Sequence, residues 1–271
     1  MVRSLWTGAT GMIAQQINLD NVANNLSNVN TTSYKAEVME FKSLLYQTLQ
    51  TKSTTANMAN KPIGAEVGLG VRNSAITSIF TQGSLLETPG PSNFAIDGEG
   101  FFAVGGTDGN TYYTRNGNLV FAIYGDDIML TTTDGLPVYS TEGEPIILDG
   151  DTVVSKITVG DGGVLYYPDE DGMPQSLDVA IGLWQFNNPA GLSKAGTSLF
   201  MESDASGAAM NEADNDDLKP SKLIQGYLEG SNVQVADEMV NMIIAQRAYE
   251  MNSKVITTSD EMLQQANQLK R

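Results

Sequence analysis

The sequence contains no histidine and no cysteine. Histidine is the commonest general base near neutral pH, cysteine is the usual thiol nucleophile, and both are principal ligands of zinc. Their absence excludes most hydrolase, redox and zinc chemistries. It leaves the redox compartment open, because a chain without thiols tolerates oxidising and reducing surroundings alike.

The chain also lacks a long apolar run. No segment approaches the ~18–20 consecutive apolar residues that a membrane-spanning helix needs, so we expect no insertion into a membrane. The amino terminus carries one positive charge, Arg3, but no apolar run of ~7–15 residues and no small-residue cleavage site follows it. We therefore expect no cleavable secretory signal, and a protein that stays inside the cell or leaves it by another route.

Positive charge is scarce as well. The chain has 15 Lys and Arg residues but 32 Asp and Glu residues. The resulting net charge of −17 argues against binding to nucleic acid or to an anionic membrane. Residues 86–220 hold 4 basic and 22 acidic side chains, whereas residues 1–85 hold 6 and 4, and residues 221–271 hold 5 and 6. Nearly neutral ends suit burial against other copies of the chain, which is a first indication of assembly.

A heptad pattern is present at each end. The apolar residues near the amino terminus that recur every seven positions are Leu5, Met12, Leu19 and Leu26. The same spacing near the carboxyl terminus links Val235, Met242, Tyr249, Ile256 and Leu263. The two patterns predict amphipathic helices over residues 4–29 and 233–269, which pair in the manner of a coiled coil. These nine residues are the candidate assembly interface.

Polar residues near the stripes give finer expectations. The amides between the first set of heptad residues, among them Asn21 and Asn25, are expected on the helix surface. Ser231 and Asn232 are placed to cap the second helix. The acidic pair Asp237-Glu238 in its early turns suits the positive end of the helix dipole.

The two heptad patterns leave two arrangements of the helices open. An intramolecular helical hairpin packed on the rest of the chain satisfies the periodicity as well as self-assembly does. A single helix pair is thin, however, and further apolar residues on its flank need additional helices, which other copies would supply. The residues of this apolar flank are Trp6, Ile13, Ile17, Ile243 and Ile244.

Between the helices the sequence changes to short β-type runs. Examples are 101–104, 111–114, 119–121, 156–159 and 183–186. Asn-Gly and Asp-Gly dipeptides such as Asp134-Gly135, which hairpin turns prefer, punctuate them. Runs at this spacing predict an antiparallel all-β domain. The stretch from Thr51 to Asn60 has neither period and indicates an irregular or extended connector.

The expected fold class is therefore α+β. In chain order we expect an N-terminal helix of the inner core at 1–30 and a connector with an extended segment at 31–80. The β domain follows at 81–226, and the C-terminal helix of the inner core at 227–271.

No motif supports catalysis or a cofactor. Gly98–Ala103 fits a dinucleotide fingerprint only superficially, because that fingerprint opens a helix and this stretch reads as a strand. Asp169–Gly172 starts like a calcium loop, but its glycine comes too early and no closing glutamate follows. We expect no enzyme, no cofactor and no metal site. The rival interpretation is a soluble β-domain binding module whose candidate contacts are Tyr112, Tyr113, Tyr166 and Tyr167.

Several stretches together resemble the flagellar rod and hook axial protein family. They are Arg3–Trp6, Ala23–Lys35, Phe80–Leu85, Phe94–Val104, Tyr113–Gly117, Ser231–Val233 and Met242–Ile256. They follow the family's order along nearly the whole chain, and residues 125–220 match loosely. The family's usual glycine is Ser33 here, so the serine has to accept the glycine's backbone angle. The family's usual phenylalanine is Tyr34.

The resemblance implies a mechanical function. Members of the family leave the cell through the flagellar type III export apparatus and polymerise helically into a tube that transmits torque from motor to hook. It implies a place in the basal body, from periplasm to outer membrane. The implied partners are further copies of the chain, other rod proteins, the hook protein, the ring proteins and the export apparatus.

Length and one segment narrow the resemblance. Hook proteins usually carry an extra outer domain, for which this chain is too short. Residues 41–48 and the connector after them are most like the members that form the distal rod. A proximal rod protein and a hook-like axial protein remain the alternatives.

Overall fold

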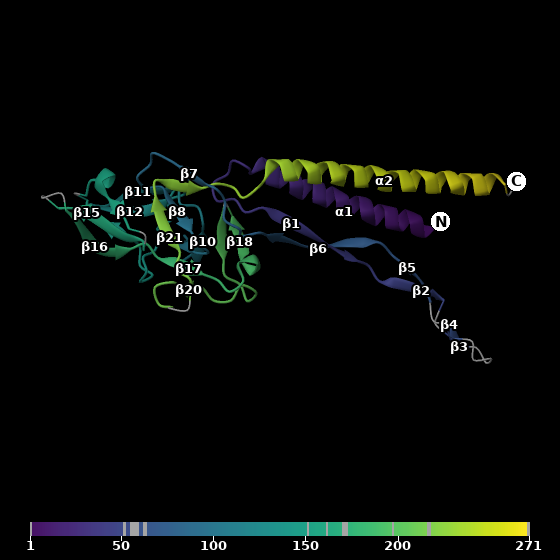
Figure 1. Cartoon of the computed structure of the whole chain (residues 1–271), viewed down its shortest axis with the longest axis horizontal. Coiled ribbons are helices and arrows are strands. Elements are labelled where there is room, and N and C mark those ends of the chain that lie inside the picture. Colours follow the sequence, from purple (N-terminus) through teal and green to yellow (C-terminus); the bar gives the residue numbers. More distant parts are fainter. Residues whose placement is uncertain are drawn as a thin grey trace. The chain divides into compact units, whose positions relative to one another are not determined.

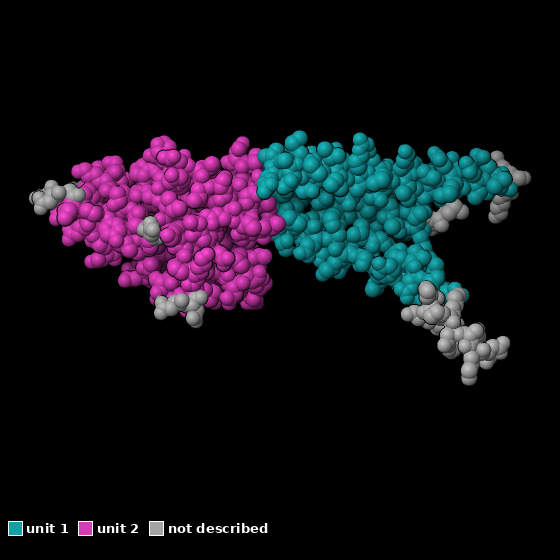
Figure 2. Space-filling model, in the orientation of Figure 1, with its two compact units in different colours: residues 1–27, 37–77, 234–271 teal, residues 28–36, 78–233 magenta. Residues whose placement is uncertain are grey.

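The computed structural model describes residues 2–50, 53–54, 60–61, 64–150, 152–160, 162–169, 173–196, 198–215 and 218–269. Most of the expected connector, residues 51–60, lies outside them. The chain forms two compact units (Figure 2). Unit 1 comprises residues 1–27, 37–77 and 234–271, and unit 2 comprises residues 28–36 and 78–233.

Two helices dominate unit 1. They are α1 (Val2–Ser27) and α2 (Val235–Gln268), so both predicted helices are confirmed, each end within two residues. They lie side by side and antiparallel (Figure 1). The hydroxyls of Ser4 and Ser259 are 3.0 Å apart, and the Asn25 amide donates to Glu238 Oε1 at 3.2 Å. Helix α2 therefore continues past the start of α1.

Glycine allows the two helices to approach closely. A Cβ atom at Gly8 would lie 3.0 Å from Ile256 Cγ1, and one at Gly11 would lie 2.8 Å from Asn252 Nδ2. Both distances are shorter than ordinary van der Waals contact, so a larger residue at either position would push the helices apart.

Unit 1 also contains a long strand ribbon. Strand β1 (Glu37–Ser43) pairs with β6 (Val71–Ser78), β2 (Tyr46–Gln50) pairs with β5 (Ala65–Gly68), and β3 (Ser53–Thr54) pairs with β4 (Asn60–Lys61). Every residue of β2 is exposed.

Two amides of α1 hold the start of this ribbon. Asn21 and Asn25 each donate to the carbonyl of Glu37 at 2.8 Å, and Asn25 accepts from its backbone N–H at 2.9 Å. Both asparagines are buried, so the prediction that they lie on the surface is wrong. The reason is that a strand backbone buried against a helix needs polar partners, which periodicity does not reveal.

The expected caps of α2 are also wrong. Gln234 is the capping residue and makes no side-chain bond. Asn232 instead accepts from the backbone N–H of Ala36 at 2.7 Å and donates to the carbonyl of Ile79 at 2.8 Å. The acidic first turn of α2, with Asp237 and Glu238, is confirmed.

Unit 2 consists of antiparallel sheets, which confirms the predicted antiparallel β domain. Its largest sheet has the order β18-β19-β10-β9-β17-β20, and two three-stranded sheets have the orders β11-β12-β13 and β14-β15-β16. Strand β8 pairs with β21, and β7 with β22. The strands are β7 (Leu85–Glu87), β8 (Phe94–Asp97), β9 (Phe101–Gly105), β10 (Thr111–Thr114), β11 (Leu119–Tyr124), β12 (Asp127–Thr132), β13 (Ile147–Leu148), β14 (Thr158–Val159), β15 (Val164–Pro168), β16 (Pro174–Ala180), β17 (Leu183–Gln185), β18 (Ser193–Gly196), β19 (Leu199–Met201), β20 (Met210–Asn211), β21 (Lys222–Gln225) and β22 (Tyr227–Glu229).

Strand β9 separates two apolar clusters because it is buried on both faces. Phe102 and Val104 belong to an aliphatic cluster, whereas Phe101 belongs to an aromatic one with Tyr113 and Phe186. Burial raises the pKa of Tyr113 to about 12, with the carboxylate of Glu202 as a second cause. Tyr113 is therefore part of the core. It is not available as one of the ligand contacts that the rival binding-module interpretation requires.

Candidate functional site

None of the nine heptad residues is fully buried in the single chain. Seven of them are half-buried and the other two, Val235 and Tyr249, are exposed. The half-buried ones are Leu5, Met12, Leu19, Leu26, Met242, Ile256 and Leu263. Ile256 lies beside Gly8 of α1 in the same chain. The intramolecular helix pair therefore covers part of the stripe, and the part these residues play in assembly stays a prediction.

The apolar flank remains uncovered. Trp6 is 68% exposed, Ile13 is 59% exposed and Ile244 is 60% exposed, and the other two flank residues, Ile17 and Ile243, are exposed as well. The expectation that one helix pair cannot cover these side chains is confirmed. Full burial of a side chain of this kind stabilises a structure by about 1.5–3 kcal/mol.

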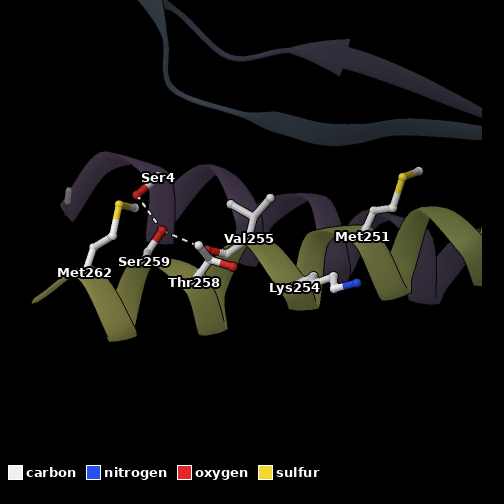
Figure 3. A pocket seen from close by; sticks show the side chains of 7 residues that line it. All are labelled: Ser4, Met251, Lys254, Val255, Thr258, Ser259 and Met262. Atoms are coloured by element: carbon white, nitrogen blue, oxygen red, sulfur yellow. Dashed lines mark hydrogen bonds between the residues drawn. The ribbon is translucent and has the colours of Figure 1, made fainter. Parts of the chain in front are cut away.

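An apolar groove runs along the same helices (Figure 3). Its volume is about 540 Å³, and Met251, Val255 and Met262 of α2 supply its apolar wall. The hydrogen bond between Ser4 and Ser259 closes one side, and Ser259 also donates to the carbonyl of Val255 at 2.7 Å. The groove therefore adds to the apolar surface that the monomer leaves open.

In unit 2 the buried carboxylate of Glu229 binds several partners. Glu229 Oε1 is 2.6 Å from Lys35 Nζ, and Glu229 Oε2 is 3.0 Å from Arg115 Nε. The backbone N–H of Gly83 donates to Oε1 at 2.9 Å, and Lys35 also donates to the carbonyl of Thr81 at 2.9 Å. We call Lys35, Arg115 and Glu229 the ion cluster. Together with residues 81–83, which bond to it, the cluster joins four stretches that are far apart in the sequence.

The cluster tolerates little additional volume. A Cβ atom at Gly83 would lie 2.0 Å from the carbonyl oxygen of Gly230, so only glycine brings this N–H to the carboxylate. Arg115 donates from Nη2 to the carbonyl of Gly98 at 2.8 Å, and its guanidinium lies 5.5 Å from the centre of the Phe101 ring. Every charged group in the cluster thus has partners, as buried charges require.

Ser33 adopts the backbone angle expected from the family's glycine, with φ of 57°. A left-handed angle costs an L-residue about 1–2 kcal/mol. The serine hydroxyl donates to the carbonyl of Arg115 at 2.7 Å, and its N–H donates to the carbonyl of Glu229 at 2.8 Å. These two bonds offset the strain and attach the segment after α1 to the ion cluster.

The pKa of Lys35 is lowered to about 8. Burial is the main cause and the nearby Arg115 guanidinium acts in the same direction, whereas the carboxylate of Glu229 opposes both. The cluster brings two cations to one anion, so one positive charge is left in excess inside the fold.

Periodicity does not reveal the ion cluster. Lys35 and Arg115 stand in stretches that carry the family resemblance, but Glu229 stands outside all of them. The one local signal for Glu229 is that a carboxylate stands within the β-type run 227–229. A charged side chain in such a run is buried only when it has a partner, so the position indicates a buried ion pair. The partner itself lies 194 positions away, at Lys35, and has no local signature.

The chain matches three family descriptions. Residues 5–35 match "Flagella basal body rod protein", residues 95–167 match "Flagellar hook protein FlgE/F/G D1 domain", and residues 224–269 match "Flagellar basal body rod FlgEFG protein C-terminal". The matched ranges contain the apolar flank, Lys35, Arg115 and Glu229.

Curated relatives align over almost the whole length. The flagellar basal-body rod protein FlgG of Borreliella burgdorferi is 42% identical over 100% of both chains. That of Agrobacterium fabrum is 42% identical over 96% of this chain and 97% of its own, and that of Bacillus subtilis is 36% identical over 100% of both. The chain belongs to the flagellar basal-body rod protein family.

As a rod protein the chain is a structural subunit of the basal body and not an enzyme, and it assembles with other components of the rod and hook. No helix among the described residues of this rod protein is long and apolar enough to cross a membrane. Within the same residues, no group of three His, Cys, Asp or Glu side chains could hold a metal ion.

The first prediction for the rod protein concerns the ion cluster. Glu229→Gln removes the only anion between two buried cations, and we expect it to lower the free energy of unfolding of unit 2 by about 3–5 kcal/mol. Urea denaturation followed by Trp184 fluorescence, with Trp6→Phe as the common background, measures this value. The matched control is Glu250→Gln, which breaks an exposed pair with Arg247 and should change stability by less than about 1 kcal/mol. Equal effects of the two substitutions would show that the cluster has no special role.

The second prediction concerns pH. Because the pKa of Lys35 is about 8 in the folded rod protein and 10.5 in the ordinary case, the unfolded chain binds more protons between these values. The contribution of Lys35 to stability therefore rises with pH across this window, by at most about 1.4 kcal/mol per pH unit. Denaturation of the wild type and of Lys35→Met from pH 7.5 to about 10.5 measures the difference. A difference that stays flat or falls with pH contradicts the prediction.

Proposed function

We propose that this chain polymerises helically into the tubular drive shaft that transmits torque from the flagellar motor to the hook. The observation that carries the proposal is the apolar flank, which stays exposed after α1 and α2 have paired. A monomer gains nothing from five large apolar side chains in water, whereas helices of other copies would bury them.

The proposal assigns a role to each part of the chain. The helices at 1–30 and 227–271 form the inner core of the tube, where they pair as a coiled coil and present the nine heptad residues. The β domain at 81–226 forms the outer layer. The connector at residues 50–70 packs between neighbouring copies and stiffens the tube; the full exposure of β2, which leads into it, supports this role.

Position and partners follow from the same proposal. The chain forms the distal rod, crosses from the periplasm to the outer membrane, and reaches its site through the flagellar type III export apparatus without a cleavable signal peptide. Its neighbours are other rod proteins, the hook protein and the surrounding ring proteins. The three relatives described above carry the name of a basal-body rod protein, which supports the rod in preference to a hook-like role.

The third prediction tests polymerisation. Ile244→Asp places a charge on the apolar flank, which is exposed in the monomer, so the monomer should fold normally. Burying that charge between copies is unfavourable, and the concentration needed to form polymer should rise at least about tenfold. Sedimentation and electron microscopy of purified full-length protein measure the change.

The matched control is Gln246→Asp, which adds the same charge to the same helix at an exposed position that lies outside the flank. It should polymerise like the wild type. If wild-type protein stays monomeric at every concentration, the proposed function is wrong. If both variants polymerise equally well, the flank is not the interface.

A further inference from the structure

The sheet β11-β12-β13 of unit 2 carries apolar side chains on the face that points away from the core. In β11-β12-β13 the side chains of Leu119, Leu130 and Leu148 are buried in the aliphatic cluster. Strand alternation and the observed register place another set on the opposite face: Val120, Ala122, Tyr124, Met129 and Ile147. Tyr124 is 63% exposed and Val120 is 44% exposed. The outward face of an antiparallel sheet is usually polar, so this one is suited to a partner.

The stretch of sequence that contains this sheet is acidic. Residues 116–155 contain seven Asp and Glu residues and no Lys or Arg. Asp127 stands opposite Tyr124 in the register, and Asp126 precedes it in the turn; both are exposed. We call this surface, the five apolar residues with Asp126 and Asp127, the acidic face. Two acidic faces cannot dock on each other, because carboxylates would oppose carboxylates.

Unit 1 carries the complementary charge. The backbone N–H of Leu44 donates to the carbonyl of Gly70 at 2.9 Å and so joins the chain segments at one end of the β1-β6 ribbon. Lys42 and Arg72 each lie two residues from this pair. Met39 of β1 is buried and Asn73 of β6 is half-buried, and each stands an odd number of positions from the cation in its own strand, so alternation directs both cations to the exposed face of the ribbon. Both are exposed.

Like charges on neighbouring strands destabilise a sheet. Strand β1 holds two carboxylates: alternation places Glu40 on the face of Lys42, where it offsets at most one of the two cations, and Glu37 on the opposite face. A partner that supplies carboxylates would relieve this repulsion. Val38 and Ile76 on the same two strands are exposed as well, so the ribbon also offers apolar contact.

We propose that the acidic face of one copy docks on the β1-β6 ribbon of the next copy, with Asp126 and Asp127 facing Lys42 and Arg72. The two surfaces differ, so the contact is head to tail. Head-to-tail contacts build rings or open helical filaments, and the proposed function requires the filament. This inference rests on the proposed function, because it names one of the surfaces through which copies polymerise.

Charge reversal in the full-length chain tests the pairing. The double variants Asp126→Lys/Asp127→Lys and Lys42→Glu/Arg72→Glu should each raise the concentration needed for polymer formation about tenfold, because attraction becomes repulsion. The variant that combines all four substitutions restores opposite charges across the contact. It should polymerise within about threefold of the wild-type concentration.

The control is Asp108→Lys/Asp204→Lys, which changes the net charge as the first double variant does but at exposed positions outside the acidic face. It should polymerise like the wild type. Wild-type polymer with no effect of either double variant, or with no rescue by the combined variant, overturns the pairing and leaves the proposed function intact. A wild type that never polymerises overturns both. Circular dichroism of each dilute variant verifies that the monomer is folded.

Discussion

The two terminal helices carry more apolar side chains than they can bury against each other. α1 and α2 approach closely at Gly8 and Gly11, and each covers part of the heptad stripe of the other. Two helices offer one shared seam, however, and side chains outside that seam have nothing to pack on within the pair. Trp6, Ile13 and Ile244 therefore face water in the single chain. The hydrophobic effect that pairs the helices also favours association of further copies.

A second constraint acts inside unit 2. The ion cluster holds Lys35, shortly after α1, and Glu229, shortly before α2, inside the same buried network of unit 2. Neither end of the chain can leave this network without exposing or orphaning a charge, so order at one end supports order at the other. The segment after α1 and the segment before α2 are therefore fixed inside unit 2 by the same buried charges.

The predictable parts of the structure are those with local signals. Seven-residue spacing located both helices to within two residues, and turn dipeptides between β-type runs indicated the antiparallel domain. The errors concern polar side chains with distant partners. Asn21 and Asn25 read as surface amides but bind the backbone of Glu37, and Asn232 read as a cap but binds Ala36 and Ile79.

Glu229 had no signal of its own, because its two cations come from other parts of the chain. The family resemblance did single out Ser33, because the serine has to accept the backbone angle of the family's usual glycine, and the structure shows a left-handed angle there. Local patterns thus specify the elements, whereas long-range hydrogen bonds and ion pairs decide how their ends are fixed.

The fluorescence of Trp6 tests the central claim most directly. In a Trp184→Phe variant Trp6 is the only tryptophan, and it lies in the apolar flank. The account predicts that polymerisation shifts its emission to shorter wavelength and lowers its quenching by acrylamide severalfold, because helices of neighbouring copies cover it. A polymer in which Trp6 is quenched as readily as in the monomer would contradict the account.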